Sequence, residues 1–140
     1  MTNQTAMKKT TVFLFPFLFL SVLVYSQKPK PAPTQGATFC GKTGEDKSSQ
    51  SIYSITELQD CDFIIVPADP TLTVVQFKLS LVAKDKSYSY KEKNIIGNTI
   101  PEEYRSVILS HTKNIFLEYI IAANSSGVRT SIKPIAVRIQ

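Results

Sequence analysis

A chain of 140 residues is long enough for one domain and too short for two, because domains usually run to about 100–150 residues. The sequence is 43% hydrophobic and 19% charged, a balance typical of globular proteins and not of disordered ones. The formal net charge of +5 is small, whereas nucleic-acid binding would need a clustered basic face. The basic residues are dispersed except in the stretches KDK at 84–86 and KEK at 91–93, where acids alternate with the lysines and indicate a solvated hairpin edge. The composition therefore indicates one globular domain and no nucleic-acid partner.

The first recognisable segment is an apolar run over residues 12–25, preceded by two lysines. The run is shorter than the roughly 20 apolar residues that span a bilayer. A basic start, a short apolar run and small residues at its end are typical of a secretory signal peptide. We expect residues 1–26 to be this signal peptide, with cleavage after Ser26 and with Met7 as an alternative start.

Export would leave a mature chain, residues 27–140, that has no membrane anchor. Removing the signal peptide takes away two lysines and no acids, so the formal net charge falls from +5 to +3. Residues 27–37 hold prolines at alternate positions, which predicts an extended spacer of polyproline character. Residues 36–51 are polar and glycine-rich and predict an irregular loop. We expect the packed domain over residues 38–140.

Two local patterns follow in chain order. Residues 54–57 fit a capping box and predict a short helical turn before Cys61. Over residues 72–82 the apolar side chains alternate, which is the period of a half-buried strand. A turn at residues 84–86 leads to a second strand in which tyrosines alternate with serines, so the two strands predict a hairpin.

The remainder of the chain predicts one helix and two more strands. A cap residue, a first-turn proline and an acid predict a short helix over residues 100–110. Residues 115–123 are apolar and β-branched, residues 124–127 form a turn, and a proline places the last strand, residues 128–139, at an edge or a bulge. The sequence therefore predicts a mainly β fold, a small antiparallel immunoglobulin-like sandwich with one short helix.

Cys40 and Cys61 are the two cysteines of the chain. In an exported protein an even number of cysteines favours a disulfide, and this one would close a loop of about 20 residues, contributing roughly 3 kcal/mol. A metal site is less favoured, because two cysteines and the distant His111 fall short of four ligands. We predict a disulfide between Cys40 and Cys61, and no metal or other cofactor.

Residues 36–43 match the P-loop pattern G-x-x-x-x-G-K-[ST] at every fixed position. A phosphate-binding loop must leave a buried strand and open a helix, so that backbone N–H groups can hold the phosphates. The proline-rich residues before the match and the polar residues after it supply neither element. We therefore interpret the match, with Lys42, as part of a solvated loop and not as a nucleotide site.

Three other features could carry chemistry: the sole histidine, two groups of acids and a glycosylation sequon. His111, the sole histidine, follows the predicted helix, where the helix C-terminus explains it, and no partner group is marked near it. The acids in residues 60–62 and 102–103 lack the loop that oxygen-ligand calcium sites use. Asn124 begins a glycosylation sequon, which matters only in an organism that modifies such sites. We predict no catalytic, cofactor-binding or metal-binding residues, and hence no enzyme.

Between residues 56 and 139 several stretches follow the order and spacing of a known family. The matching stretches are TELQDCDF at 56–63, VQFKLS at 75–80, GNT at 97–99, IFLEYIIA at 115–122, GVR at 127–129 and KPIAV at 133–137. In these residues the chain resembles the C-terminal domain of the gliding-motility protein GldM. That family forms the periplasmic shaft of a Bacteroidetes motor that drives gliding and type IX secretion.

The resemblance implies a module and a compartment. Full-length family members are far longer and have a transmembrane helix, whereas a signal peptide is expected here. We expect an exported, non-enzymatic protein-interaction module in the periplasm or at the cell surface, with a protein partner in the cell envelope that belongs to a gliding-motility or type IX secretion complex. The alternative is a small exported ligand-binding protein or enzyme whose site the sequence does not mark.

Overall fold

The computed structural model describes residues 35–43, 50–89 and 91–140, which lie in one compact unit, Pro31–Gln140. The expected signal peptide, residues 1–26, and most of the expected spacer lie outside the described residues. Gln35, the first described residue, forms a parallel β-bridge with Ile132. In the part of the chain that is described, no helix combines the length and the apolar character needed to cross a bilayer.

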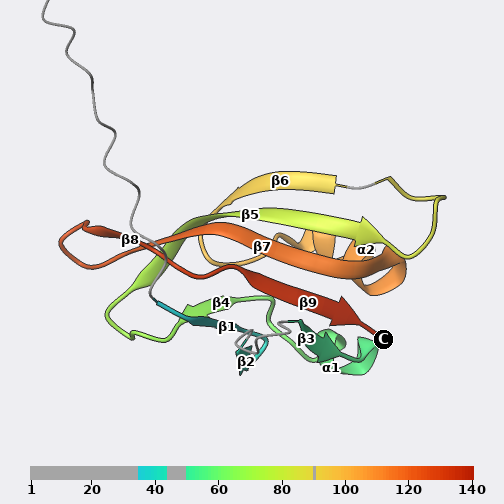
Figure 1. Ribbon diagram of the computed structural model, residues 1–140, viewed down its shortest axis with the longest axis horizontal. Helices are drawn as coiled ribbons and strands as arrows, with labels where there is room; N and C mark the ends of the chain where they lie inside the picture. The colour runs from blue at the N-terminus through green and yellow to red at the C-terminus, as the bar shows by residue number, and fades with distance from the viewer. Residues whose placement is uncertain (1–34, 44–49, 90) are drawn as a thin grey trace, which may run out of the picture. The chain divides into compact units, whose positions relative to one another are not determined.

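The larger of two sheets has the strand order β3-β9-β7-β5-β6, and β8 pairs with β7 (Figure 1). Its strands are β3 (Ser51–Tyr53), β5 (Thr73–Ala83), β6 (Lys91–Ile96), β7 (Thr112–Ala123), β8 (Arg129–Ser131) and β9 (Ile135–Ile139). Neighbouring strands are antiparallel, except that β3 runs parallel to β9. β6 therefore forms one edge of this six-stranded sheet and β3 forms the other.

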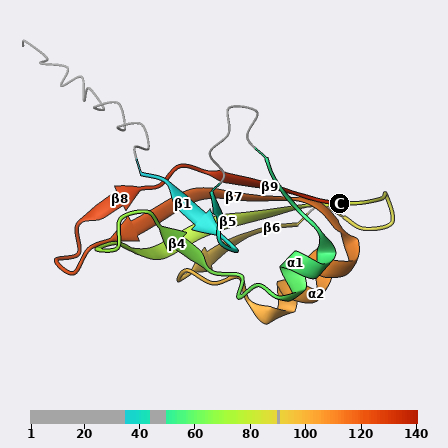
Figure 2. The ribbon, with the colours of Figure 1, turned by 90° about the horizontal axis from the view of Figure 1, so that it is seen from below.

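The smaller sheet has the order β2-β1-β4 and is built from β1 (Ala37–Phe39), β2 (Lys42–Thr43) and β4 (Ile65–Pro67). Two helices accompany it, α1 (Ile55–Gln59) and α2 (Glu102–His111). Figure 2 shows both helices and β4 on one side of the six-stranded sheet. The apolar core lies between these layers, and the predicted class, a small mainly β sandwich, is confirmed.

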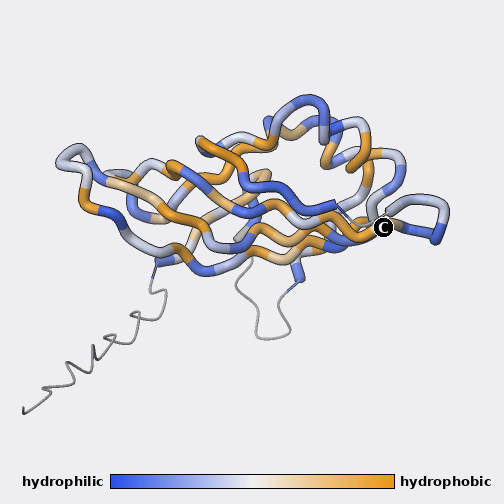
Figure 3. The backbone as a smooth tube through the Cα atoms, turned by 90° about the horizontal axis from the view of Figure 1, so that it is seen from above, coloured by the Kyte–Doolittle hydropathy of each residue, from blue (hydrophilic) through white to orange (hydrophobic). Residues whose placement is uncertain are grey.

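The predicted strand over residues 72–82 is β5, and its alternation holds from residue 77 to residue 81. Nearer the start of the strand Val74 is buried out of phase with that alternation, because the register with β7 shifts there. Phe77, Leu79 and Leu81 are buried in the core, and Lys78 points to the other face because successive strand side chains alternate. Figure 3 shows the same alternation of hydrophobic and hydrophilic residues along the strands. The helix predicted over residues 100–110 is α2, and the predicted helical turn is α1.

The irregular loop predicted over residues 36–51 is wrong at both of its ends. β1 and β2 form a hairpin near its start, and β3 begins at its last residue, while residues 44–49 lie outside the described part. The polar composition of this segment is overridden by pairing with distant strands, since β1 pairs with β4 and β3 pairs with β9. Ala37 and Phe39 are buried as a result.

A bulge in β7 changes which residues face the core. Ile115 and Leu117 are buried before the bulge, and Ile120 and Ala122 are buried after it. Tyr119, at the bulge, adopts a φ of 49° and is 68% exposed. One extra residue in a strand shifts the alternation by one position, so the bulge keeps both halves of β7 packed on the core.

Candidate functional site

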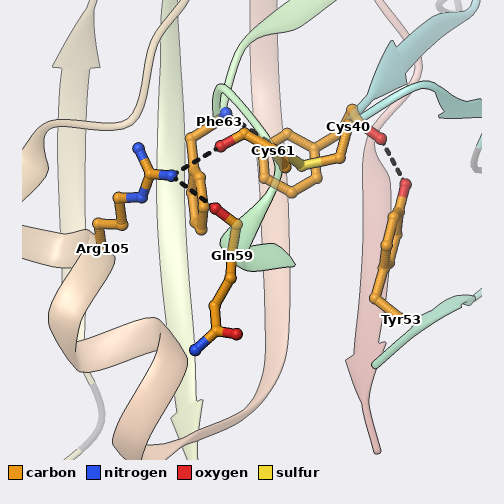
Figure 4. The surroundings of a disulfide bond; sticks show 7 residues. Cys40, Tyr53, Gln59, Cys61, Phe63 and Arg105 are labelled. Carbon is orange, nitrogen blue, oxygen red and sulfur yellow. Dashed lines mark hydrogen bonds between the residues drawn. A yellow bond between two sulfur atoms is a disulfide. The ribbon is translucent and has the colours of Figure 1, made fainter. Parts of the chain in front are cut away.

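Cys40 and Cys61 form a disulfide, as the sequence predicts, with their Cα atoms 5.3 Å apart (Figure 4). Cys40 lies in the turn between β1 and β2, and Cys61 follows α1. The bond therefore connects the smaller sheet to the segment that leads from α1 into β4. The backbone N–H of Phe63 donates a hydrogen bond to the Cys61 sulfur over 3.1 Å, which fixes the chain just after the bond.

Arg105 connects α2 to the same segment (Figure 4). Its guanidinium donates to the backbone carbonyl oxygens of Gln59, at 3.1 Å, and of Cys61, at 3.0 Å. The last carbonyl groups of a helix lack partners within the helix, and here an arginine supplies donors at the end of α1. The guanidinium carbon also lies 4.9 Å from the centre of the Phe63 ring, a cation–π contact.

Phe39, Tyr53 and Phe63 form an aromatic cluster beside the disulfide. Phe39 contacts Tyr53 and Phe63 edge to face, with ring centres 6.4 Å and 5.8 Å apart. The Tyr53 hydroxyl is buried and donates a hydrogen bond to the backbone carbonyl of Phe39. Burial raises the pKa of Tyr53 to about 12, because the charged phenolate loses its hydration.

Lys42, the lysine of the P-loop match, is engaged in several contacts. Its Nζ atom lies 2.7 Å from a carboxylate oxygen of Glu57, donates to the backbone carbonyl of Ile52 over 3.0 Å, and lies 4.4 Å from the centre of the Tyr53 ring. The prediction of a solvated loop is therefore wrong for Lys42, which belongs to β2 and joins β2 to β3 and α1. Residues 36–43 form β1, a turn and β2, and this hairpin has no helix after it in the described part of the match.

Glu57 links this ion pair to the start of α1. The predicted capping box is present: the Ser54 hydroxyl accepts from the Glu57 N–H, and the Glu57 carboxylate accepts from the Ser54 N–H at 2.7 Å. Hydrogen bonds from Lys42 and then from Ser54 stabilise the carboxylate and lower the pKa of Glu57 to about 2. Glu57 therefore carries a full negative charge at neutral pH.

A hollow of about 330 Å³ opens beside the disulfide. Its lining residues are Cys40, Gly41, Glu57, Asp60, Cys61, Asp62, Ile64 and Val66. The structure thus places the acids of residues 60–62 together with Glu57 and the disulfide, while residues 102–103 lie in the first turn of α2. Across the described ranges, no group of three His, Cys, Asp or Glu side chains is placed to hold a metal ion.

His111 and Asn124 lie away from this hollow. His111 ends α2 and stacks on Tyr88 with ring centres 4.5 Å apart, and Lys91 lies over the Tyr88 ring at 5.2 Å. The Asn124 carboxamide oxygen accepts hydrogen bonds from the N–H groups of Ser126 and Val128, both over 3.0 Å, and so holds the turn between β7 and β8. Both residues have local structural contacts.

The sequence did not reveal the contacts of Tyr53 and Arg105, because each joins segments that lie apart in the chain.

Neither the scan against protein-family models nor the search of curated proteins finds a match to this chain. The geometry around the disulfide combines a covalent cross-link, an arginine link, a buried tyrosine and an ion pair. This combination can hold five elements, β1, β2, β3, α1 and α2, in fixed positions, and an acidic hollow lies beside it.

Proposed function

We propose that the chain is an exported, non-enzymatic interaction module that docks on a protein partner in the cell envelope. The observation that carries this proposal is the one-sided packing of the six-stranded sheet (Figure 2). The helices and the smaller sheet pack on one face, and no described element covers the other face. Exposed apolar side chains, Ile96 at 82% and Tyr119 at 68%, lie on strands of this sheet. A sheet with an open face and a free edge offers both side chains and backbone groups to a partner.

Two observations support the compartment. The Cys40–Cys61 disulfide is the kind of bond that persists in oxidising compartments such as the periplasm or the cell surface. The resemblance of residues 56–139 to the GldM C-terminal domain supports the Bacteroidetes envelope. We therefore place the partner in a gliding-motility or type IX secretion complex.

A second candidate function rests on the hollow beside the disulfide. Its volume of about 330 Å³ is at the lower end of the roughly 300–1,000 Å³ that small-molecule sites occupy. Asp60 and Asp62 give the hollow an acidic lining, which would suit a small cationic ligand. This candidate makes the chain an exported ligand-binding protein.

Affinity capture from envelope extracts tests both functions. The full chain, tagged after Gln140 and expressed in a gliding bacterium of the Bacteroidetes, should enrich a single envelope protein. The Asp60→Asn, Asp62→Asn double variant serves as the matched control, because it alters the hollow and leaves the sheet intact. Equal capture by the variant supports protein docking. A small molecule that copurifies with the wild type and is lost from the variant supports the second candidate instead.

A further inference from the structure

One end of the six-stranded sheet concentrates lysines from the β5–β6 turn, β6 and the start of β7. We call them the hairpin lysines: Lys84, Lys86, Lys91, Lys93 and Lys113. The turn is held against the end of α2, because the Lys84 N–H donates to the His111 carbonyl over 2.8 Å and Tyr88 stacks on the His111 ring. β7 begins at this point and pairs with the end of β5 through Thr112 and Ala83. Lysines that are spread over thirty positions of sequence thus gather at one end of the fold.

The pleat of β6 separates these lysines from the acid that lies between them in sequence. Lys91 and Lys93 are paired with Leu81 and Leu79, so they face the same side as the core residues of β5. Glu92 points to the opposite face, where it forms an ion pair with Lys78 over 2.8 Å. The alternation therefore leaves two positive charges together on one face of the edge strand.

Asp85, the second acid in this region, forms its hydrogen bonds within the β5–β6 turn. The Asp85 carboxylate accepts hydrogen bonds from the Ser87 backbone N–H, over 2.8 Å, and from the Ser87 hydroxyl. These bonds lower the pKa of Asp85 and fix its carboxylate within the turn. Lys84 and Lys86, on either side of it, are both exposed. Asp85 stays charged and exposed, but the five hairpin lysines outnumber the two acids of this region, Asp85 and Glu92, so this end of the sheet is basic.

β6 is also an edge strand, with β5 as its neighbour in the sheet. The backbone N–H and C=O groups on the outer side of an edge strand can pair with another extended chain. Ile96, at the end of β6, is 82% exposed and offers an apolar contact beside that edge. The edge of β6 therefore combines backbone pairing groups, two lysines on one face and an apolar residue.

We propose that β6 accepts an extended acidic segment of a partner protein as an added strand. The inference rests on the proposed docking function and names the chemistry of the partner. Asp or Glu at alternate positions of that segment would lie opposite Lys91 and Lys93, and the other hairpin lysines would attract it over the roughly 8 Å at which charges act in physiological salt. A second copy of β6 is disfavoured as the occupant, because like charges would face each other across the edge.

Titration with two capped synthetic peptides tests the proposal. One peptide alternates Glu and Thr over ten residues, and the other alternates Glu and Pro, so that both carry the same charge. Proline has no N–H and cannot complete a strand ladder. We expect the Glu–Thr peptide to bind at least tenfold more tightly than the Glu–Pro peptide. In NMR spectra the β6 amides should shift and gain protection from hydrogen exchange.

Charge variants locate the binding edge. Lys91→Gln with Lys93→Gln should weaken the Glu–Thr peptide about tenfold, which corresponds to about 1.4 kcal/mol. Arg129→Gln with Lys133→Gln removes the same charge from exposed positions near β8 and should leave the affinity unchanged. Thermal melts of both variants check that they are folded.

Several results would overturn the inference. Equal affinity for the two peptides would mean that the lysines attract acids without strand addition. No binding of the Glu–Thr peptide at millimolar concentration in low salt would also reject it, as would binding confined to vesicles that contain phosphatidylglycerol. A captured envelope protein that binds the Lys91→Gln, Lys93→Gln variant as well as the wild type would reject the β6 site and leave the docking function standing.

Discussion

The hydroxyl of Tyr53, in β3 of the larger sheet, donates a hydrogen bond to the backbone carbonyl of Phe39, in β1 of the smaller sheet. Tyr53 is 1% exposed and Phe39 is fully buried, so this bond joins the two layers from inside the core. A buried carbonyl that loses its donor remains unsatisfied and destabilises the fold. The pair is therefore a stability determinant beside the disulfide.

Tyr53→Phe should lower the free energy of unfolding by about 1–3 kcal/mol, because it removes the donor and keeps the ring. Urea denaturation at pH 7 measures the change. Tyr119→Phe is the matched control, since Tyr119 is 68% exposed, and it should stay within about 0.5 kcal/mol of the wild type. Equal losses in the two variants would contradict a special role for the buried hydroxyl.

The raised pKa of Tyr53 predicts that the domain loses stability in alkaline solution. Its pKa is raised from 10.0 to about 12 in the folded protein, so between these values the unfolded chain releases a proton that the folded chain retains. The stabilisation that Tyr53 provides is complete below about pH 10 and declines as the pH rises toward 12. Denaturant midpoints for the wild type and Tyr53→Phe should converge over this range. A constant difference between them from pH 9 to 12 would count against the raised pKa.

The lowered pKa of Glu57 predicts that the domain also loses stability in acidic solution. Its pKa is lowered from 4.5 to about 2, so the folded state retains the charge while the unfolded chain takes up a proton. The contribution of Glu57 is present above about pH 4.5 and is lost as the pH falls toward 2. The difference in thermal midpoint between the wild type and Glu57→Gln should shrink over that range.

A double-mutant cycle separates the sources of the Glu57 effect. The hydrogen bond from Lys42 is the largest cause of the lowered pKa, and the capping bonds from Ser54 follow. In a Lys42→Ala background, Glu57→Gln should therefore show a weaker dependence on pH than it does in the wild type. An unchanged dependence would assign the effect to the capping box alone.

Reduction of the disulfide should destabilise the domain by about 3 kcal/mol, because the bond joins two cysteines 21 positions apart and closes a loop that is open in the reduced unfolded chain. Denaturation with and without dithiothreitol measures the difference. The Cys40→Ser, Cys61→Ser double variant should match the reduced protein and should not respond to the reductant. Thiol labelling of the denatured, unreduced chain should find no free cysteine, and two reactive thiols would disprove the bond.

The elements that the sequence predicted are those whose signal is local. β5 shows its alternation from Phe77 to Leu81, although the register shift near Val74 breaks it at the start of the strand, and α1 carries its capping box within four residues. β1 and β3 gave no such signal, because each has three residues and is stabilised by a strand far along the chain. The bulge at Tyr119 was equally hidden, since an apolar run of β-branched residues does not reveal where the alternation shifts.

The candidate site likewise contains one feature that the sequence predicts and several contacts that it does not. The cysteine pair followed from the count of cysteines and the expected export, without any knowledge of the fold. Arg105 and Cys61 are 44 residues apart, and Tyr53 reaches a carbonyl 14 residues earlier, so neither contact has a sequence pattern. The separation of Glu92 from Lys91 by the pleat needed the strand register, which the sequence alone leaves open.

Two neighbouring positions in β5 test that register directly. Phe77 is 2% exposed and packs in the core, so Phe77→Ala should lower the free energy of unfolding by about 3–5 kcal/mol through lost burial and the cavity left behind. Lys78 lies on the opposite face, with its side chain 26% exposed and paired with Glu92, so Lys78→Ala should cost less than about 1 kcal/mol. Denaturant midpoints of the two variants, compared at equal slope, provide the measurement. A one-residue slip of β5 would exchange the two outcomes, because every side chain would then move to the other face. If Lys78→Ala destabilised the domain as much as Phe77→Ala, the position of β5 in the sandwich would be wrong.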